Sequence, residues 1–277
     1  MTRNIRHERI CELLRARGEC SVEELGRALG VSGMTIRRDL RALAAEGKAI
    51  RTHGGAAMAQ RISFEFGFLE RVKEQEAAKT AIGRAAAALI RDGQSVMLDS
   101  GTTTLALSRQ LHGKAGLTVI TTSLPIASEL QYDEGIEVLL LGGYLRPASP
   151  DLAGVLTQSN LEAVRADLAF IGADGIDAGG AVYNQSPEVA RMLARMSAAA
   201  ERVYVVADST KLGKTALWRF GHLKNWAGLV TDDGADRSLV ASLRKAGVSI
   251  IKTPLKGPLP SRGAARYDRP SRKQQGG

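Results

Sequence analysis

Two patterns of hydrophobic and polar positions divide the chain. From residue 79 to residue 251, short runs of Val, Ile and Leu alternate with amphipathic stretches of helical periodicity. Such runs are typical of strands buried on both faces, and each amphipathic stretch can cross back over a sheet. The pattern predicts a doubly wound, mostly parallel α/β domain. Strands are expected at residues 95–98, 117–121, 137–141, 168–172, 203–207, 228–231 and 248–251, and helices at 81–90, 105–111, 125–131, 188–200 and 237–246.

The first 57 residues show a shorter helical pattern. They predict a first helix that ends near Gly18, a second at 22–29 that ends at Gly30, and a third that Ser32 can cap. With a strand at 48–52 as a small wing, this order predicts a winged helix-turn-helix. The buried faces are expected to consist of Ile5, Ile10, Leu13 and Leu14 in the first helix and Ile36, Leu40 and Leu43 in the third.

The outer face of the third predicted helix is cationic. Guanidinium groups on a helix of this size can pair with guanine edges or with phosphates in the major groove, and the wing can touch the DNA backbone beside it. The alternative is a small helical dimerisation unit whose arginines form a solvated face. The candidate DNA-binding residues are Ser32, Met34, Thr35, Arg37, Arg38, Arg41, Arg51 and His53.

Positive charge is concentrated at the two ends of the chain. The net charge is +9, with +4 in residues 1–57, +6 in residues 252–277 and −1 between them. Because the N-terminal excess coincides with the helical motif, double-stranded operator DNA is the expected partner. Pro, Gly, Arg and Ser dominate the sequence from Pro254 onward, which predicts a disordered basic tail that is solubilising or attracts DNA without specificity.

Length and composition favour one small and one larger domain. The chain has 277 residues, 44% of them hydrophobic, which is enough for two separate cores. It contains no apolar run of transmembrane length and no signal-peptide core, so a cytoplasmic protein without membrane contact is expected. Cys11 and Cys20 are too few for a disulfide framework or a zinc site, and neither a cofactor nor a metal is expected.

The domain boundaries follow these patterns. The segment between the two domains holds Phe64, Phe66 and Phe68, whose alternate spacing indicates either a segment docked onto a core or an ordinary edge strand. Any ligand signal must pass through this segment. The expected organisation is a winged helix-turn-helix domain at 1–57, a linker or docking segment at 58–78, a sensor domain at 79–253 and a tail at 254–277.

Polar residues follow the predicted strands, where ligands bind in parallel α/β sheets. Residues 99–104, Asp-Ser-Gly-Thr-Thr-Thr, can cradle a phosphate at a helix N-terminus, or can simply form a well-capped turn. Cations there suit a phosphate and carboxylates suit sugar hydroxyls, so the junctions predict a pocket for a small phosphorylated polyol. The candidate effector-binding residues are Asp99, Ser100, Gly101, Thr102, Thr103, Thr104, Ser123, Arg146, Asp174 and Lys211.

From about residue 9 to residue 252, the chain resembles the DeoR-type bacterial transcriptional regulators. The most specific stretch is V-S-G-M-T-I-R-R-D-L at 31–40, followed by R-T-H-G-G-A at 51–56. The resemblance implies a winged-helix domain joined to a sensor similar in fold to ribose-5-phosphate isomerase, and it favours a symmetric homo-oligomer. The matching stretches of the second half are 98–104, Gly142-Gly143 with Arg146, 167–172 and 207–211.

The function that the resemblance implies is repression of a carbohydrate-catabolism operon, with release of DNA when a phosphorylated sugar binds. One alternative is a sugar-phosphate isomerase with Asp174 as general base, and another is an activator of the same fold. Two departures from the family pattern lie near the expected pocket: Ala190 replaces a lysine and Thr122 replaces an asparagine. These departures predict a different effector or weakened sensing.

Overall fold

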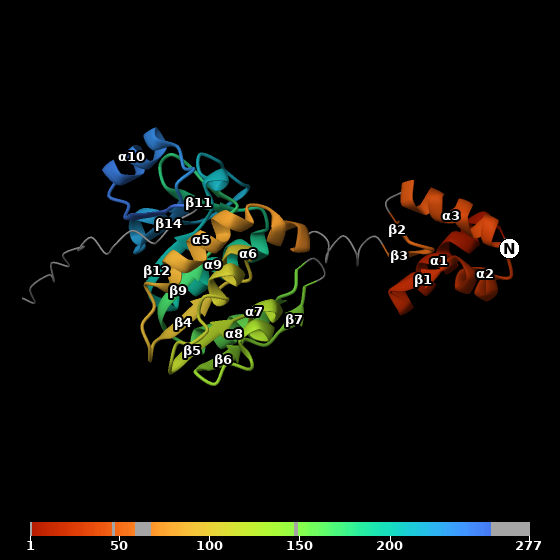
Figure 1. The fold of residues 1–277 in the computed structure, drawn as a ribbon, viewed down its shortest axis with the longest axis horizontal. Coiled ribbons are helices and arrows are strands. Elements are labelled where there is room, and N and C mark those ends of the chain that lie inside the picture. The colour runs from red at the N-terminus through yellow and green to blue at the C-terminus, as the bar shows by residue number, and fades with distance from the viewer. Residues whose placement is uncertain (1, 46–47, 59–67, 147–148, 256–277) are drawn as a thin grey trace, which may run out of the picture.

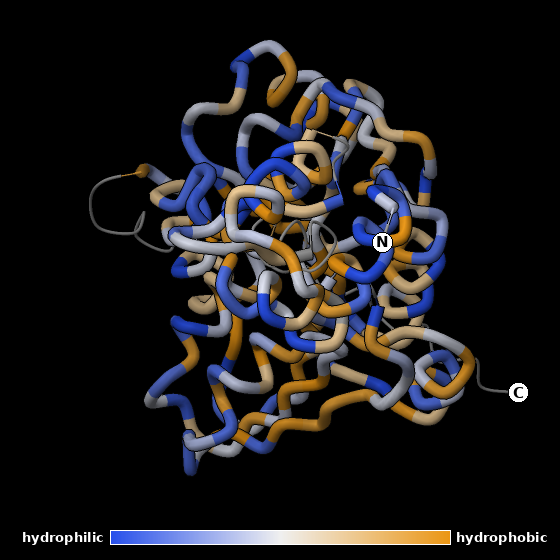
Figure 2. Tube along the Cα trace, turned by 90° about the vertical axis from the view of Figure 1, so that its right-hand side faces the viewer, coloured by the Kyte–Doolittle hydropathy of each residue, from blue (hydrophilic) through white to orange (hydrophobic). Residues whose placement is uncertain are grey.

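The chain folds into two parts with separate hydrophobic cores (Figure 1). Figure 2 shows hydrophobic and hydrophilic residues interspersed along the coloured part of the Cα trace. In the parts that are described, no helix is both long and apolar enough to cross a membrane. The computed structural model describes residues 2–45, 48–58, 68–146 and 149–255, so residues 59–67 of the expected linker, with Phe64 and Phe66, and most of the expected tail lie outside the described residues.

The N-terminal part is a winged helix-turn-helix. Its three strands form an antiparallel sheet in the order β1-β3-β2, so the wing is larger than the single strand expected at 48–52. Cys11 and Cys20 are buried free cysteines that pack in its hydrophobic core. The elements are α1 (Arg3–Arg17), β1 (Glu19–Ser21), α2 (Val22–Leu29), α3 (Gly33–Ala45), β2 (Ala49–Thr52) and β3 (Gly55–Met58).

Local capping sets where α2 begins and ends. Ser21 and Glu24 form a capping box at the start of α2, and Gly30 ends the helix in the left-handed conformation that favours glycine. The apolar stripe of α3 is buried as expected, but Ile5 on α1 is 52% exposed, contrary to the expected buried face. The first turn of α1 therefore contributes no apolar anchor at Ile5.

A buried ion pair joins α1 to α3. Arg6 Nε donates to the Asp39 carboxylate at 2.6 Å, and the His7 ring lies 3.2 Å from the same group. Burial raises the pKa of Asp39, but the hydrogen bonds from Arg6 and His7 outweigh that effect and hold it below its usual value. The pair fixes the helix with the cationic outer face against the first helix of the domain.

The second part contains a seven-stranded parallel sheet in the order β15-β14-β12-β9-β4-β5-β6. The doubly wound architecture predicted from the sequence is confirmed. The predicted bounds of β4 and β5 agree with the structure, whereas β15 begins two residues later than expected. The strands are β4 (Ser95–Leu98), β5 (Leu117–Thr121), β6 (Ile136–Leu140), β9 (Ala166–Ile171), β12 (Ala200–Val206), β14 (Gly228–Asp232) and β15 (Ile250–Thr253).

Helices cover both faces of this sheet. Side chains of α5, α6 and α7 share one core with Val96, Leu98 and Val119, and side chains of α8, α9 and α10 share the other with Met97 and Ile120. The alternate strand positions therefore face different cores, as expected for a doubly covered sheet. The helices are α5 (Glu76–Ala87), α6 (Thr102–Ser108), α7 (Leu124–Leu130), α8 (Val155–Ala163), α9 (Pro187–Ala198) and α10 (Arg237–Lys245).

Several short elements were not predicted. No pattern in the sequence predicted α8, a β7–β8 hairpin or an antiparallel β10-β11-β13 sheet, because these strands are short and lack continuous apolar runs. These elements contribute several of the loops around the sheet edge. Their bounds are β7 (Tyr144–Leu145), β8 (Leu152–Ala153), β10 (Gly175–Ile176), β11 (Ala181–Asn184) and β13 (Trp218–His222), with short 3-10 turns at Ser209–Lys211 and Leu223–Asn225.

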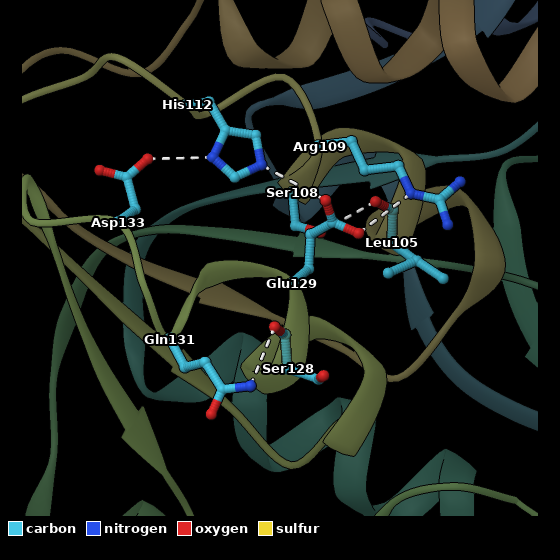
Figure 3. Close-up of polar contacts among 8 residues, drawn as sticks. All are labelled: Leu105, Ser108, Arg109, His112, Ser128, Glu129, Gln131 and Asp133. Atoms are coloured by element: carbon cyan, nitrogen blue, oxygen red, sulfur yellow. Dashed lines mark hydrogen bonds and ion pairs between the residues drawn. The ribbon is translucent and has the colours of Figure 1, made fainter.

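A charged cluster ties the end of α6 to α7 (Figure 3). The His112 ring lies 3.0 Å from Asp133 and 3.3 Å from Glu129, and Arg109 donates to Glu129 at 3.2 Å. The hydrogen bonds to Asp133 and Glu129 raise the pKa of His112 above its ordinary value. The imidazolium is therefore the form that holds the two helices together.

We expect Asp39→Ala to lower the free energy of unfolding of the N-terminal part by about 1–3 kcal/mol, because charge-assisted hydrogen bonds are lost and Arg6 keeps no carboxylate. Urea denaturation measures this effect. Glu12→Ala is the matched control, since it removes the exposed ion pair that Arg9 makes on the same helix. An equal cost in both variants would contradict a special role of the buried pair.

We expect the stabilisation from His112 to depend on pH. Because its folded pKa is raised, the stabilisation is fully present below the ordinary value of 6.5 and is lost as the pH rises through the raised value. At acidic pH the wild type should unfold at a higher temperature than His112→Gln, by a few degrees at most because the cluster is partly exposed. This difference in unfolding temperature should shrink at alkaline pH. A constant difference across pH would contradict the assignment.

Candidate functional site

The outer face of α3 presents the expected cations to solvent. Met34, Arg37, Arg38 and Arg41 are spaced at i, i+3, i+4 and i+7, so they lie on one side of the helix, and all four are exposed. The opposite side carries the buried stripe that packs on α1 and α2. Met34 is 80% exposed, which leaves a flexible apolar side chain among the guanidinium groups.

The remaining candidate DNA contacts flank this face. The Ser32 hydroxyl accepts a hydrogen bond from the Thr35 backbone N-H at 3.3 Å and lies 3.1 Å from the Thr35 hydroxyl. Ser32 therefore caps α3, as predicted. Arg51 on β2 and His53 in the β2–β3 turn are exposed. The structure thus places all eight candidates on the helix that would enter a groove or on the wing of the same domain.

A cavity of about 530 Å³ lies beyond the carboxyl ends of β4, β9 and β12. This is where ligands bind in open α/β sheets. Eight of the ten predicted effector residues line it, although they come from four separate stretches of the chain. They are Asp99, Ser100, Gly101, Thr102, Thr103, Arg146, Asp174 and Lys211.

Two predicted effector residues do not line this cavity. Thr104 is fully buried, and its hydroxyl donates to the Asp99 carboxylate. Ser123 is 1% exposed, and its hydroxyl accepts from the Ile126 N-H at the start of α7. Both hydroxyls thus hold the loops in place, as the capped-turn alternative describes.

Asp99 organises the loop at the end of β4. Its carboxylate accepts hydrogen bonds from the Gly101 N-H at 2.9 Å, from the Gly172 N-H at 2.6 Å and from Thr104. Burial raises the pKa of Asp99 despite these donors. Because three donors already occupy its oxygens, Asp99 holds the β4–α6 loop against the end of β9 and has little capacity left for sugar hydroxyls.

The β7–β8 hairpin reaches the cavity through an ion pair. Arg146 binds Asp151 through two hydrogen bonds of 2.8 Å, and the Ser100 hydroxyl donates to the same carboxylate at 2.7 Å. Asp151 is 5% exposed. The hairpin and the β4–α6 loop are therefore linked through one buried carboxylate.

Lys79 is a cavity residue that sequence reasoning missed. It lies on α5, is 6% exposed, and its ammonium donates to the carbonyl oxygen of Arg71. Burial lowers the pKa of Lys79, whereas nearby Asp208 and Glu74 act to raise it. The available signal was a lysine three residues before Ile82 on the apolar stripe of a helix, a position where an unpaired charge would be costly.

Lys211 is the second ammonium in this cavity. It ends the 3-10 turn after β12, and within the described residues no acceptor is recorded for its side chain. The turn itself is held by Asp208, which accepts from the Thr210 N-H at 3.0 Å. The turn therefore presents a cation whose hydrogen-bonding capacity is open to a ligand.

The second half of the expected linker or docking segment also lines the cavity. Residues 68–73 are helical, and Phe68, Arg71, Glu74 and Gln75 contribute to the wall. Gln75 has φ 51°, which is the left-handed conformation and is uncommon for a residue with a side chain. Phe68, which belongs to the predicted docking segment, is 7% exposed and packs into the core of the sensor.

The unpredicted antiparallel sheet supplies further polar groups. Asn184, Gln185 and Ser186 line the cavity between β11 and α9, and the Gln185 N-H donates to Asp174 at 2.9 Å. Of the two departures from the family pattern, Thr122 lines a small neighbouring cavity. Ala190 is buried and lines neither of the two cavities. No group of three or more metal-binding side chains occurs among the residues that the structure describes.

Comparison with solved structures finds ribose-5-phosphate isomerase A from Neisseria gonorrhoeae. It is 17% identical, aligns with 48% of this chain and 52% of its own, and has a TM-score of 0.37.

Comparisons of sequence identify both parts of the chain. Residues 6–61 match the DeoR-like helix-turn-helix domain, and residues 74–233 match the DeoR C-terminal sensor domain. The HTH-type transcriptional regulator GolR of Listeria innocua is 34% identical over 88% of this chain and 96% of its own length. The lactose phosphotransferase system repressor of Lactococcus lactis is 34% identical over 77% and 85%. These relatives are named as regulators rather than as isomerases, and the chain belongs to the DeoR family of transcriptional regulators.

Proposed function

We propose that this protein is a DNA-binding repressor of a carbohydrate-catabolism operon and that a phosphorylated sugar bound in the sensor cavity releases it from its operator. The observation that carries the proposal is the cavity itself, where Lys79, Lys211 and Arg146 lie among hydroxyl, amide and carboxylate groups. Cations suit a phosphate ester and the neutral and acidic groups suit a polyol. A volume of about 530 Å³ lies within the range of small-molecule sites.

The relatives support a sugar-linked role. The repressor from Lactococcus lactis is named for a lactose phosphotransferase system, and this chain matches it over most of its length. That name concerns the Lactococcus protein, and the cavity lining supports the effector class proposed for this chain. The proposed class is a monophosphorylated sugar, since a nucleotide base would favour an aromatic surface, whereas Phe68 is the only aromatic residue in the described lining.

The N-terminal domain supplies the proposed DNA contact. Arg37 and Arg38 would pair with bases or phosphates in the major groove, while Ser32, Thr35 and Arg41 extend the contact along the helix. Arg51 and His53 would meet the backbone beside the groove. The buried pair of Arg6 and Asp39 supports this role because it sets the angle of α3 within the domain.

The segment from Phe68 to Lys79 is the proposed route of coupling. It belongs almost entirely to the expected linker or docking segment and also lines the cavity, so a bound ligand would touch the part of the chain that leads into the sensor. A phosphate would compete with the Arg71 carbonyl for the Lys79 ammonium. Phosphate binding would then break the hydrogen bond between α5 and the helical segment at 68–73. The free and bound states would differ in this bond, and such a difference lets a ligand shift the equilibrium between them.

Replacing either Arg37 or Arg38 with Ala should weaken specific DNA binding by about 1–3 kcal/mol if the side chain pairs with a base. Fluorescence anisotropy with a duplex selected by the protein from a random library measures the change. Arg84→Ala is the control, because Arg84 is an exposed arginine on α5 of the sensor. Unchanged DNA affinity in a variant that carries both Arg37→Ala and Arg38→Ala would contradict the proposed contact between α3 and DNA.

Replacing Lys211 with Met should leave DNA affinity unchanged and weaken effector binding by about 1.5–3 kcal/mol, the usual contribution of a charge-assisted hydrogen bond. Thermal shift against sugar phosphates, the matching free sugars and inorganic phosphate identifies the effector, because a ligand of the folded state raises the unfolding temperature. DNA release is then measured with the sugar phosphate that gives the largest shift.

Lys245→Met is the matched control for this experiment, since Lys245 is an exposed lysine on α10 away from the cavity lining.

Lys79→Met should reduce DNA release more than it reduces the thermal shift, because Lys79 also binds the carbonyl oxygen of Arg71 in the helical segment before α5. If none of the sugar phosphates stabilises the wild type, the proposed effector class is wrong.

A further inference from the structure

Met34 is an apolar residue that lies outside the hydrophobic core of the described N-terminal residues. It is the second residue of α3 and is 80% exposed, whereas Ile36, Leu40 and Leu43 of the same helix are at most 1% exposed. Because each residue of a helix is rotated by about 100° from the one before it, Met34 points away from the side that Ile36 buries. The fold therefore leaves the Met34 side chain available to a partner.

The backbone that carries Met34 is held in place at the start of α3. The Thr35 N-H donates to the Ser32 hydroxyl at 3.3 Å. A side chain added at Gly33 would meet Cγ1 of Val22 at 3.2 Å, so this turn also packs closely on α2. Met34 therefore combines a backbone in a defined position with a flexible, unbranched side chain.

The neighbours of Met34 indicate which partner would cover it. Arg37 and Arg38 lie three and four positions further along the same face of α3, and both are exposed. In a helix-turn-helix domain, duplex DNA covers such a face, and the first residues of the helix contact base edges in the major groove. Because a thioether side chain has no donor for a phosphate, Met34 would meet a base edge there.

Thymine offers the apolar group that such a side chain needs. Its C5 methyl is the one apolar group among major-groove edges that otherwise carry hydrogen-bond donors and acceptors. The thioether of methionine has no donor and is a weak acceptor, so it cannot pair with guanine or adenine as a guanidinium or an amide does. The flexible methylenes and terminal methyl of Met34 can instead pack against the methyl group of the base.

We infer that Met34 reads a thymine in the bound DNA by packing against its C5 methyl group. This inference rests on the proposed entry of α3 into the major groove, and it assigns a base to a residue that carries no charge. The arginines of the same face can pair with guanine edges or phosphates, so Met34 adds a preference that guanidinium groups do not supply. Burial of one methyl-sized group corresponds to about a fourfold preference.

Substitution of single thymines by deoxyuridine tests the inference, because deoxyuridine lacks only the methyl group. The probe is the duplex that the wild type selects from a random library, and fluorescence anisotropy with the full chain gives each dissociation constant. For the wild type, we expect deoxyuridine at one thymine of the recognised sequence to raise Kd about fourfold. Met34→Ala should bind the thymine and deoxyuridine duplexes equally at that position.

Ile5→Ala is the matched control, since Ile5 is an apolar residue on α1 that is 52% exposed. It should keep the wild-type response to deoxyuridine at every thymine. Because alanine is a good helix former and Met34 is exposed, Met34→Ala should fold like the wild type, and unfolding temperatures check this. The ratio of the two dissociation constants remains measurable even if the variant binds all duplexes more weakly.

Three results would overturn the inference while leaving the proposed function intact. The wild type could bind the selected duplex with no response to the loss of any thymine methyl group, Met34→Ala could respond as the wild type does, or Ile5→Ala could lose the response as well. Failure of the proposed DNA contact gives a different result, since the wild type would then bind the selected duplex no more tightly than one of scrambled sequence.

Discussion

The arrangement of the sensor depends on how buried carboxylates hold the loops at the carboxyl edge of the sheet. Asp99 accepts the N-H groups of Gly101 and Gly172, and it thereby joins the loop after β4 to the end of β9. Asp151 joins Ser100 of the same loop to Arg146 of the hairpin. Each carboxylate satisfies several donors at once, which offsets the cost of burying its charge. The cavity has its shape because these loops cannot move independently.

These carboxylates also explain which parts of the site could be predicted from sequence. The carboxyl ends of parallel strands lie at one edge of the sheet, so residues in the loops after the strands, such as Ser100, Asp174 and Lys211, were correctly expected to lie close together. Sequence does not show which polar atoms satisfy each other. Thr104 donates to Asp99 and Ser123 caps a helix, so these groups bind partners within the protein and not a ligand.

An element of the fold could be predicted where its own residues show the pattern that defines it. The apolar runs at 95–98 and 117–121 gave strands with the same bounds because both faces of each are buried by helices. The β10-β11-β13 sheet could not be inferred in this way, since its strands have two to five residues and gain their stability from distant partners. Lys79 was missed for a related reason, because the first of its counter-charges, Asp208, lies more than a hundred residues further along the sequence.

Lys79 indicates how small a change can couple the two domains. Its buried ammonium has a carbonyl partner on Arg71 and nearby carboxylates on Asp208 and Glu74. A phosphate that exchanged the carbonyl for a charge-assisted bond would contribute about 1.5–3 kcal/mol, if that bond formed in one state only. Typical allosteric couplings amount to about 1–3 kcal/mol. One hydrogen bond that differs between states is therefore sufficient, and the residue that accepts this bond, Arg71, itself lines the cavity.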